Sequence, residues 1–254
     1  MASASGEESN RAVAHINVDT ENEDDTDDED DTFDLYQMEY TTLDEEVLVQ
    51  LKQNDPTIDK LALCLDFAAA GNIFESNDIN WIDEGHHIAK NTHIKVLAID
   101  HLASPAATEN TLAFYSAVSQ IRTIKHLYIG GLIIGSRDIM KTLSPTFKYN
   151  RLRTLNVNLH DDDFTVAGAQ HLSKALSKFT SLRKFQFNIE YGGADRLLAK
   201  IVTALDKHQN LRELALVGNY IGRNSYIALR QLLQSPTKLE SLNLDGNITL
   251  VMNG

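Results

Sequence analysis

Apolar residues recur along the chain in one short pattern: an apolar residue, two of any kind, a second apolar residue, one of any kind and a third apolar residue. Seven such triplets start at residues 58, 94, 124, 152, 182, 211 and 239, so that successive starts lie 36, 30, 28, 30, 29 and 28 residues apart. One triplet means little, but seven in nearly constant phase indicate an internal repeat. The alternation at the end of each triplet predicts a short strand with one buried face.

Stretches with helical spacing lie between the triplets. Ala169, Leu172 and Leu176 fall three or four residues apart, and similar stripes occupy residues 197–205 and 229–233. Such spacing places apolar side chains on one face of a helix. Each unit is therefore predicted to contain a strand, a turn, a helix and a return turn, with the helix serving as the crossover that parallel strands require.

Two segments carry the whole pattern: LRELALVGNYIGRNSYIALRQLLQSPTK at Leu211–Lys238 and LRTLNVNLHDDDFTVAGAQHLSKALSKFTS at Leu152–Ser181. On these residues the chain resembles the leucine-rich repeat family, in its ribonuclease-inhibitor-like class. The resemblance covers residues 58–254. It implies an α/β fold: a leucine-rich-repeat solenoid, or right-handed α/β horseshoe, with a parallel concave sheet and outer helices.

The family also has an asparagine after the strand, which bonds the backbone turn of the neighbouring repeat. This chain has it as Asn219 and Asn247, while the remaining repeats carry Asp66, Leu102, Leu132, His160 and Glu190. We therefore expect the middle of the array to be less regular than its C-terminal end. The long first spacing leaves an insertion around Ala70–Asn80, which we interpret as a surface loop, or alternatively as a partner contact.

The two ends of a repeat stack need cover, because they expose apolar layers and unpaired strand edges. At the N-terminal end, Thr42-Leu43-Asp44-Glu45 matches a capping box. We predict a helix over about 43–53, packed on the first strand. At the opposite end, the seventh repeat stops at Gly254 without a helix. We expect either that the chain is a fragment of a longer protein or that another chain covers this end.

Acidic residues are concentrated at the N-terminus. Residues 1–56 hold 18 of the 36 Asp and Glu but two of the 23 Lys and Arg, a net charge of −16, against +3 for the rest. We expect residues 1–40 to be a disordered acidic tail, because like charges repel and little there can be buried. Residues 41–254 then form the repeat domain. The tail is interpreted as a solubility tail; docking of a basic protein such as a histone is the alternative, ahead of calcium capture.

Composition excludes several classes of protein. No apolar run approaches the ~20 residues that cross a bilayer, and no secretory signal precedes the tail, so we expect no membrane association. The acidic tail would repel phosphates, which disfavours nucleic acid as a partner. The single cysteine, Cys64, fits a reducing compartment, so the expected location is intracellular, cytoplasmic or nuclear.

Candidate catalytic groups do not converge in the sequence. Neighbouring His86 and His87 would diverge by about 100° on a helix and could not grip one metal together. The run Asp161–Asp163 fits a favourable helix N-terminus, and Gly130, Gly131 and Gly135 are interpreted as a turn. Cys64 has no identifiable base. We therefore expect no enzyme, no metal site and no cofactor.

Stacked repeats would align the outward positions of successive strands in columns. Repeats three to five then place one polar group together on the concave face: His126, Tyr128, Asn156, Asn158, Lys184, Gln186 and Asn188. Tyrosine and amide side chains suit protein contacts, because they combine flat apolar area with adaptable hydrogen bonds. The alternative is that these side chains are merely solvated.

These observations favour a non-enzymatic protein–protein interaction scaffold that binds an unidentified partner protein on the concave face. A small-GTPase regulator of the GTPase-activating type is one alternative. Proteins of the resembled class with acidic tails include activators of the nuclear-transport GTPase, although here the acidic run is N-terminal. An acidic chaperone for basic proteins, acting through the tail, is a second possibility, and a sensor module of a longer protein is a third.

Overall fold

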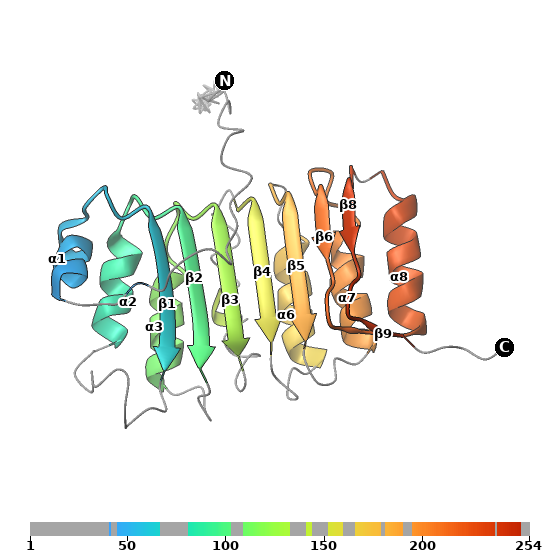
Figure 1. Ribbon diagram of the computed structural model, residues 1–254, viewed down its shortest axis with the longest axis horizontal. Helices are drawn as coiled ribbons and strands as arrows, with labels where there is room; N and C mark the ends of the chain where they lie inside the picture. The colour runs from blue at the N-terminus through green and yellow to red at the C-terminus, as the bar shows by residue number, and fades with distance from the viewer. Residues whose placement is uncertain are drawn as a thin grey trace, which may run out of the picture. The chain divides into compact units, whose positions relative to one another are not determined.

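Seven strands form a single parallel sheet in the computed structural model, which describes residues 41, 45–66, 81–102, 109–132, 141–143, 152–159, 166–178, 181–189, 195–236 and 238–249. All of these belong to one compact unit, 34–254. Each triplet contributes one strand, and the strands follow the order of the chain (Figure 1): β1 Lys60–Asp66, β2 Val96–Leu102, β3 His126–Leu132, β4 Thr154–Leu159, β5 Lys184–Ile189, β6 Glu213–Ala215 and β8 Ser241–Asn243.

Helices connect most neighbouring strands and lie together on one side of the sheet (Figure 1). The described helices are α1 Glu45–Gln53, α2 Trp81–Lys90, α3 Glu109–Val118, α6 Val166–Leu176, α7 Asp195–Leu205 and α8 Arg223–Gln234. Neighbouring helices pack against each other, as α2 does with α3 and α7 with α8. A mixed α/β arrangement with one parallel sheet fits repeats of the leucine-rich type. The predicted tail, the insertion at 70–80 and the Asp161–Asp163 run lie outside the described residues.

The core lies between the sheet and the helices. The triplet positions that face inward are buried in β1 to β6, and the rings of Phe185 and Phe187 stack with their centroids 6.1 Å apart. Leu198, Ile201 and Leu205 of helix α7 are buried in the same core cluster. Because apolar burial is worth roughly 1.5–3 kcal/mol for each large side chain, this layer is the main source of stability. Beyond β6 the cover thins, and Leu244 and Ile248 are exposed.

Helix α1 and Thr41 lie at the start of the array. Helix α1 extends the helix layer beside α2 (Figure 1), and its Leu51 is buried in the same core as Leu61 of β1. Thr41 contacts the outer edge of β1: its backbone N–H donates to Ala62 O at 2.7 Å, while Ala62 N–H donates to Thr41 Oγ1 at 3.4 Å. Thr41 thus pairs the backbone N–H and C=O of Ala62, edge groups of the kind that are otherwise open to pairing with another chain.

Asn219 makes the inter-repeat contacts expected of the asparagine after the strand. Its Nδ2 donates to Phe187 O at 2.8 Å and to Val217 O at 3.2 Å, and its Oδ1 accepts from Ile189 N at 3.1 Å. Its own N–H donates to Asn247 Oδ1 at 2.7 Å. These bonds join three repeats. Beside them, β7 (Tyr220–Ile221) pairs in parallel with β9 (Ile248–Thr249).

His208 is a second polar link between repeats. It follows α7, is 2% exposed, and its Nε2 lies 2.8 Å from Leu176 O at the end of the preceding helix. A carbonyl can only accept, so Nε2 carries a proton in this contact. Burial lowers the pKa of His208 below its usual 6.5, although the bond to Leu176 opposes this.

Acidification should therefore destabilise the fold through His208. The unfolded chain takes up this proton before the folded chain does, so the contribution is complete above pH ~6.5 and declines as pH falls below that value. Urea unfolding at neutral and mildly acidic pH would show it. We expect His208→Gln to lose less stability on acidification than the wild type, and an equal loss in both proteins would exclude His208 as the responsible group.

Candidate protein-contact face

The register of the sheet brings most of the predicted contact residues together on its outward face. In one row His126, Thr154 and Lys184 are register partners, and in the next row Tyr128, Asn156 and Gln186 are. Asn158 and Asn188 pair one row further along β4 and β5. The predicted residues thus occupy three neighbouring strands, and we call His126, Tyr128, Asn156, Asn158, Lys184, Gln186 and Asn188 the outward patch.

The third row of outward positions is interrupted between β3 and β4. The register between β3 and β4 shifts between Ile129 and Leu132, so Gly130 does not lie opposite Asn158. Gly131 has a φ of 64°, a left-handed conformation that glycine adopts without a Cβ penalty. The pair Gly130–Gly131 is therefore a bulge within β3 rather than a turn after it, and it adds one residue to that strand.

Tyr128 lies over this bulge. A Cβ built at Gly130 would be 2.6 Å from Tyr128 Cζ and 2.7 Å from its Cε1, closer than real contacts allow. The phenol ring thus occupies the space that any other residue at position 130 would need. Glycine at this position therefore leaves room for the one aromatic ring in the outward patch.

The patch is less exposed than a solvated face would be. His126 and Asn156 are buried, with 1% and 3% of their surface exposed, while the remaining five residues are half-buried. Side chains on adjacent strands stand only ~4.8 Å apart, so they shield one another. His126 Nδ1 lies 3.0 Å from Thr154 Oγ1, and Lys184 Nζ forms an ion pair with Glu213 Oε2 at 3.0 Å. The half-buried side chains are the ones that can meet a partner.

Three asparagine side chains give the patch unused acceptors. The Oδ1 atoms of Asn156, Asn158 and Asn188 are shielded from water and have no hydrogen-bond partner in the described structure. A buried acceptor left unpaired costs about 1–3 kcal/mol. Asn158 and Asn188 are register partners and are half-buried as whole residues. A ligand that donates hydrogen bonds would relieve this cost.

Reactive groups are scattered over the parts of the chain that the structure describes. No three His, Cys, Asp or Glu side chains there come close enough to hold a metal ion. His86 and His87 lie in α2, where His86 is exposed, and Glu84 of the same helix forms an ion pair with Lys52 at 3.9 Å. Cys64 in β1 is half-buried and is not part of a disulfide. Of the described helices, none combines the length and apolarity needed to span a bilayer.

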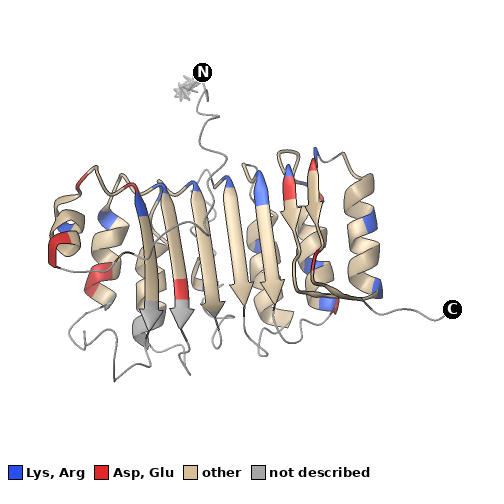
Figure 2. Cartoon of the chain, viewed as in Figure 1, with Lys and Arg blue, Asp and Glu red and all other residues tan. Residues whose placement is uncertain are grey.

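Sequence reasoning missed a line of basic residues at the amino ends of the strands (Figure 2). The position after the first apolar residue of the triplet is basic in five successive repeats: Lys95, Lys125, Arg153, Arg183 and Arg212. The periodicity itself was the available signal, since this position recurs every 28 to 30 residues here. The basic position of each repeat comes one residue before the first outward-facing position of the strand.

Comparison with known proteins adds little to this description. No protein-family model matches the chain, and no curated protein matches it. Among solved structures, "Leiomodin-1 Actin-Binding Site 2 (ABS2)" matches with a TM-score of 0.45 and 16% sequence identity, covering 76% of this chain and 96% of that one. At these values the match supports no conclusion about activity or partner.

Proposed function

We propose that the chain is a leucine-rich-repeat solenoid that acts as a protein-interaction module without enzymatic activity and binds a partner protein through the outward patch. One strand for each triplet, the helical crossovers and the inter-repeat bonds of Asn219 support the repeat assignment. The register of β3, β4 and β5 supports the function most, because it gathers a tyrosine, amides and a lysine on one face.

The chemistry of the patch favours a protein partner over a small molecule. Tyr128 offers rigid apolar area, which protein interfaces use as an anchor. The asparagine oxygens and Gln186 add adaptable hydrogen bonds around it. The partner should therefore bring donors, such as backbone N–H groups, lysine or arginine, to the acceptors of Asn158 and Asn188.

Paired alanine variants would test this proposal. Tyr128→Ala with Gln186→Ala should weaken partner binding at least fivefold, because an anchor ring and its neighbouring amide are removed. The measurement is quantitative affinity capture from lysate with the full chain, comparing recovered proteins between variants, followed by titration of any protein that the wild type enriches.

The matched control removes the same two residue types from the helix side of the molecule. Tyr226 and Gln231 are exposed in α8, so Tyr226→Ala with Gln231→Ala removes a tyrosine and a glutamine away from the patch. Proteins that bind the patch should be retained by this control and lost from the Tyr128/Gln186 variant. An identical set of captured proteins from both variants would refute the patch, provided circular dichroism shows both to be folded.

A further inference from the structure

The basic residues at the strand entries form a continuous row held by the backbone. Lys125 N–H donates to Lys95 O, Arg153 N–H to Lys125 O, and Arg183 N–H to Arg153 O, each at 2.7–2.8 Å. Arg212 N–H then donates to Arg183 O at 2.7 Å. We call Lys95, Lys125, Arg153, Arg183 and Arg212 the cationic row. Asp59 and Glu240 occupy the same position in the first and last repeats and end the row.

The row is most accessible at its Lys95 end. Lys95 is exposed, Lys125, Arg183 and Arg212 are half-buried, and Arg153 is buried. Arg212 forms an ion pair with Glu240 at 2.6 Å, so the far end is partly neutralised within the sheet. The positive charge that a ligand can meet is therefore concentrated where β2 and β3 begin.

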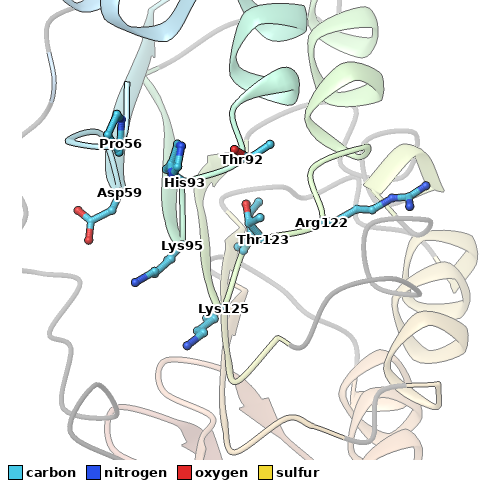
Figure 3. A pocket seen from close by; sticks show the side chains of 9 residues that line it. Pro56, Asp59, Thr92, His93, Lys95, Arg122, Thr123 and Lys125 are labelled. Atoms are coloured by element: carbon cyan, nitrogen blue, oxygen red, sulfur yellow. The ribbon is translucent and has the colours of Figure 1, made fainter. Parts of the chain in front are cut away.

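A cavity of about 450 Å³ opens at this accessible end. It is lined by Pro56, Asp59, Thr92, His93, Lys95, Arg122, Thr123, Ile124 and Lys125. Figure 3 shows the side chains of Lys95 and Lys125 running in the same direction from neighbouring strands, while the Arg122 guanidinium points away from them. The two ammonium groups thus point to the same side, and the carboxylate of Asp59 also lines the cavity.

The backbone of the row has no amide to offer an anion. The N–H groups of Lys95, Lys125, Arg153, Arg183 and Arg212 all bond carbonyls of the preceding repeat. A phosphate cradle is normally built from free N–H groups at a loop or helix N-terminus. Recognition here must come from side-chain cations spaced along a line rather than from a closed anion pocket.

We propose that the cationic row is a second docking surface, which binds an acidic polypeptide segment in extended form with its first carboxylates at the cavity of Lys95 and Lys125. Strands ~4.8 Å apart give the row a length of ~19 Å from Lys95 to Arg212. An extended peptide of about six residues spans that distance. This surface lies outside the outward patch, so it does not depend on the proposed function.

A single-stranded nucleic acid fits the row less well than an acidic peptide. Proteins that bind single strands combine cations with aromatic rings on which bases stack. No Phe, Tyr or Trp lines the cavity, and the cationic row has none. The chain carries a net charge of −13, which repels an acidic peptide and a nucleic acid alike at a distance, so the binding of either depends on direct contact with the row.

Fluorescence anisotropy with the full chain and a labelled octaglutamate peptide tests the proposal. At low salt, about 50 mM, we expect saturable binding that Lys95→Gln with Lys125→Gln weakens about fivefold, since exposed ion pairs are individually modest. The matched control is Lys90→Gln with Lys200→Gln, which removes the same charge from exposed positions on α2 and α7. It should change the affinity less than twofold.

Three results would overturn the inference. Equal weakening in both variants would show diffuse attraction rather than a site. No binding of the peptide to the wild type at low salt would show that the row does not dock acidic segments. Tighter binding of an oligothymidylate of equal charge, lost in the Lys95/Lys125 variant, would assign the row to nucleic acid. Circular dichroism of all variants separates these results from misfolding.

Discussion

Replacing Asn219 with alanine is expected to lower the free energy of unfolding by about 2–4 kcal/mol. The side chain is 2% exposed and holds three backbone groups: Phe187 O, Ile189 N and Val217 O. Alanine cannot replace any of these bonds, and Phe187 and Ile189 are themselves buried. Because the bonds join successive repeats, the loss should affect the cooperativity of the array as well as its stability.

Asn247→Ala provides the comparison, because it removes the same residue type one repeat later. Asn247 is half-buried, accepts one bond from Asn219 N and donates one to Leu244 O. Its loss should cost about 1 kcal/mol or less, since water can reach this end of the sheet. Urea unfolding followed by circular dichroism would measure both. Equal costs for the two variants would mean that the bonds of Asn219 are not what stabilises the inter-repeat junction.

The sheet could be predicted from sequence because its cause is local and repeated. Each triplet alternates apolar and polar positions, so the buried face of every strand, for example Leu155 and Val157 in β4, is fixed by the pattern. Stacking of equivalent triplets then fixes the register, which is why His126 and Thr154 are neighbours. The asparagine contacts followed from the family resemblance rather than from the pattern.

The features that the sequence did not predict share a physical cause. Each depends on contacts across repeats or on backbone conformation. The bulge at Gly130–Gly131 requires a left-handed glycine, and two adjacent glycines suit a turn equally well in a sequence. The burial of His126 and Asn156 depends on the surrounding side chains, which alternation along one strand does not describe. The edge bond of Thr41 to Ala62 joins residues 21 positions apart, outside any repeat.

Another contact across repeats concerns the start of α8. Gly222 is the N-cap of this helix and has no side chain to cap it. The carboxylate of Asp195, from the first turn of α7, accepts the N–H groups of Gly222, Asn224 and Ser225 at 2.7–2.9 Å. It also accepts the Ser225 hydroxyl. A Cβ at Gly222 would lie 2.7 Å from Asp195 Cγ, so glycine is needed for this approach.

The charge of Asp195 is stabilised by these bonds. Burial raises its pKa, but the hydrogen bonds from Ser225 and Asn224 outweigh that effect and lower the pKa from 3.8 to about 2. Asp195 is therefore ionised in the folded chain at all ordinary pH values. Its stabilising effect is complete above pH ~3.8 and is lost as pH falls toward 2, because the unfolded chain is protonated first.

Asp195→Ala should destabilise the chain by about 2 kcal/mol near neutral pH, because the helix loses its cap and the buried Ser225 hydroxyl keeps only the longer bond to Gly222 O at 3.3 Å. Gly222→Ser alone should also destabilise, since its Cβ meets the Asp195 carboxylate. The double variant should recover part of the stability that Asp195→Ala loses. Alanine at position 195 leaves the space that the Cβ at position 222 needs, and serine is itself a good N-cap. A double-mutant cycle by urea unfolding measures this coupling, and strictly additive losses would contradict a cap supplied by the neighbouring repeat.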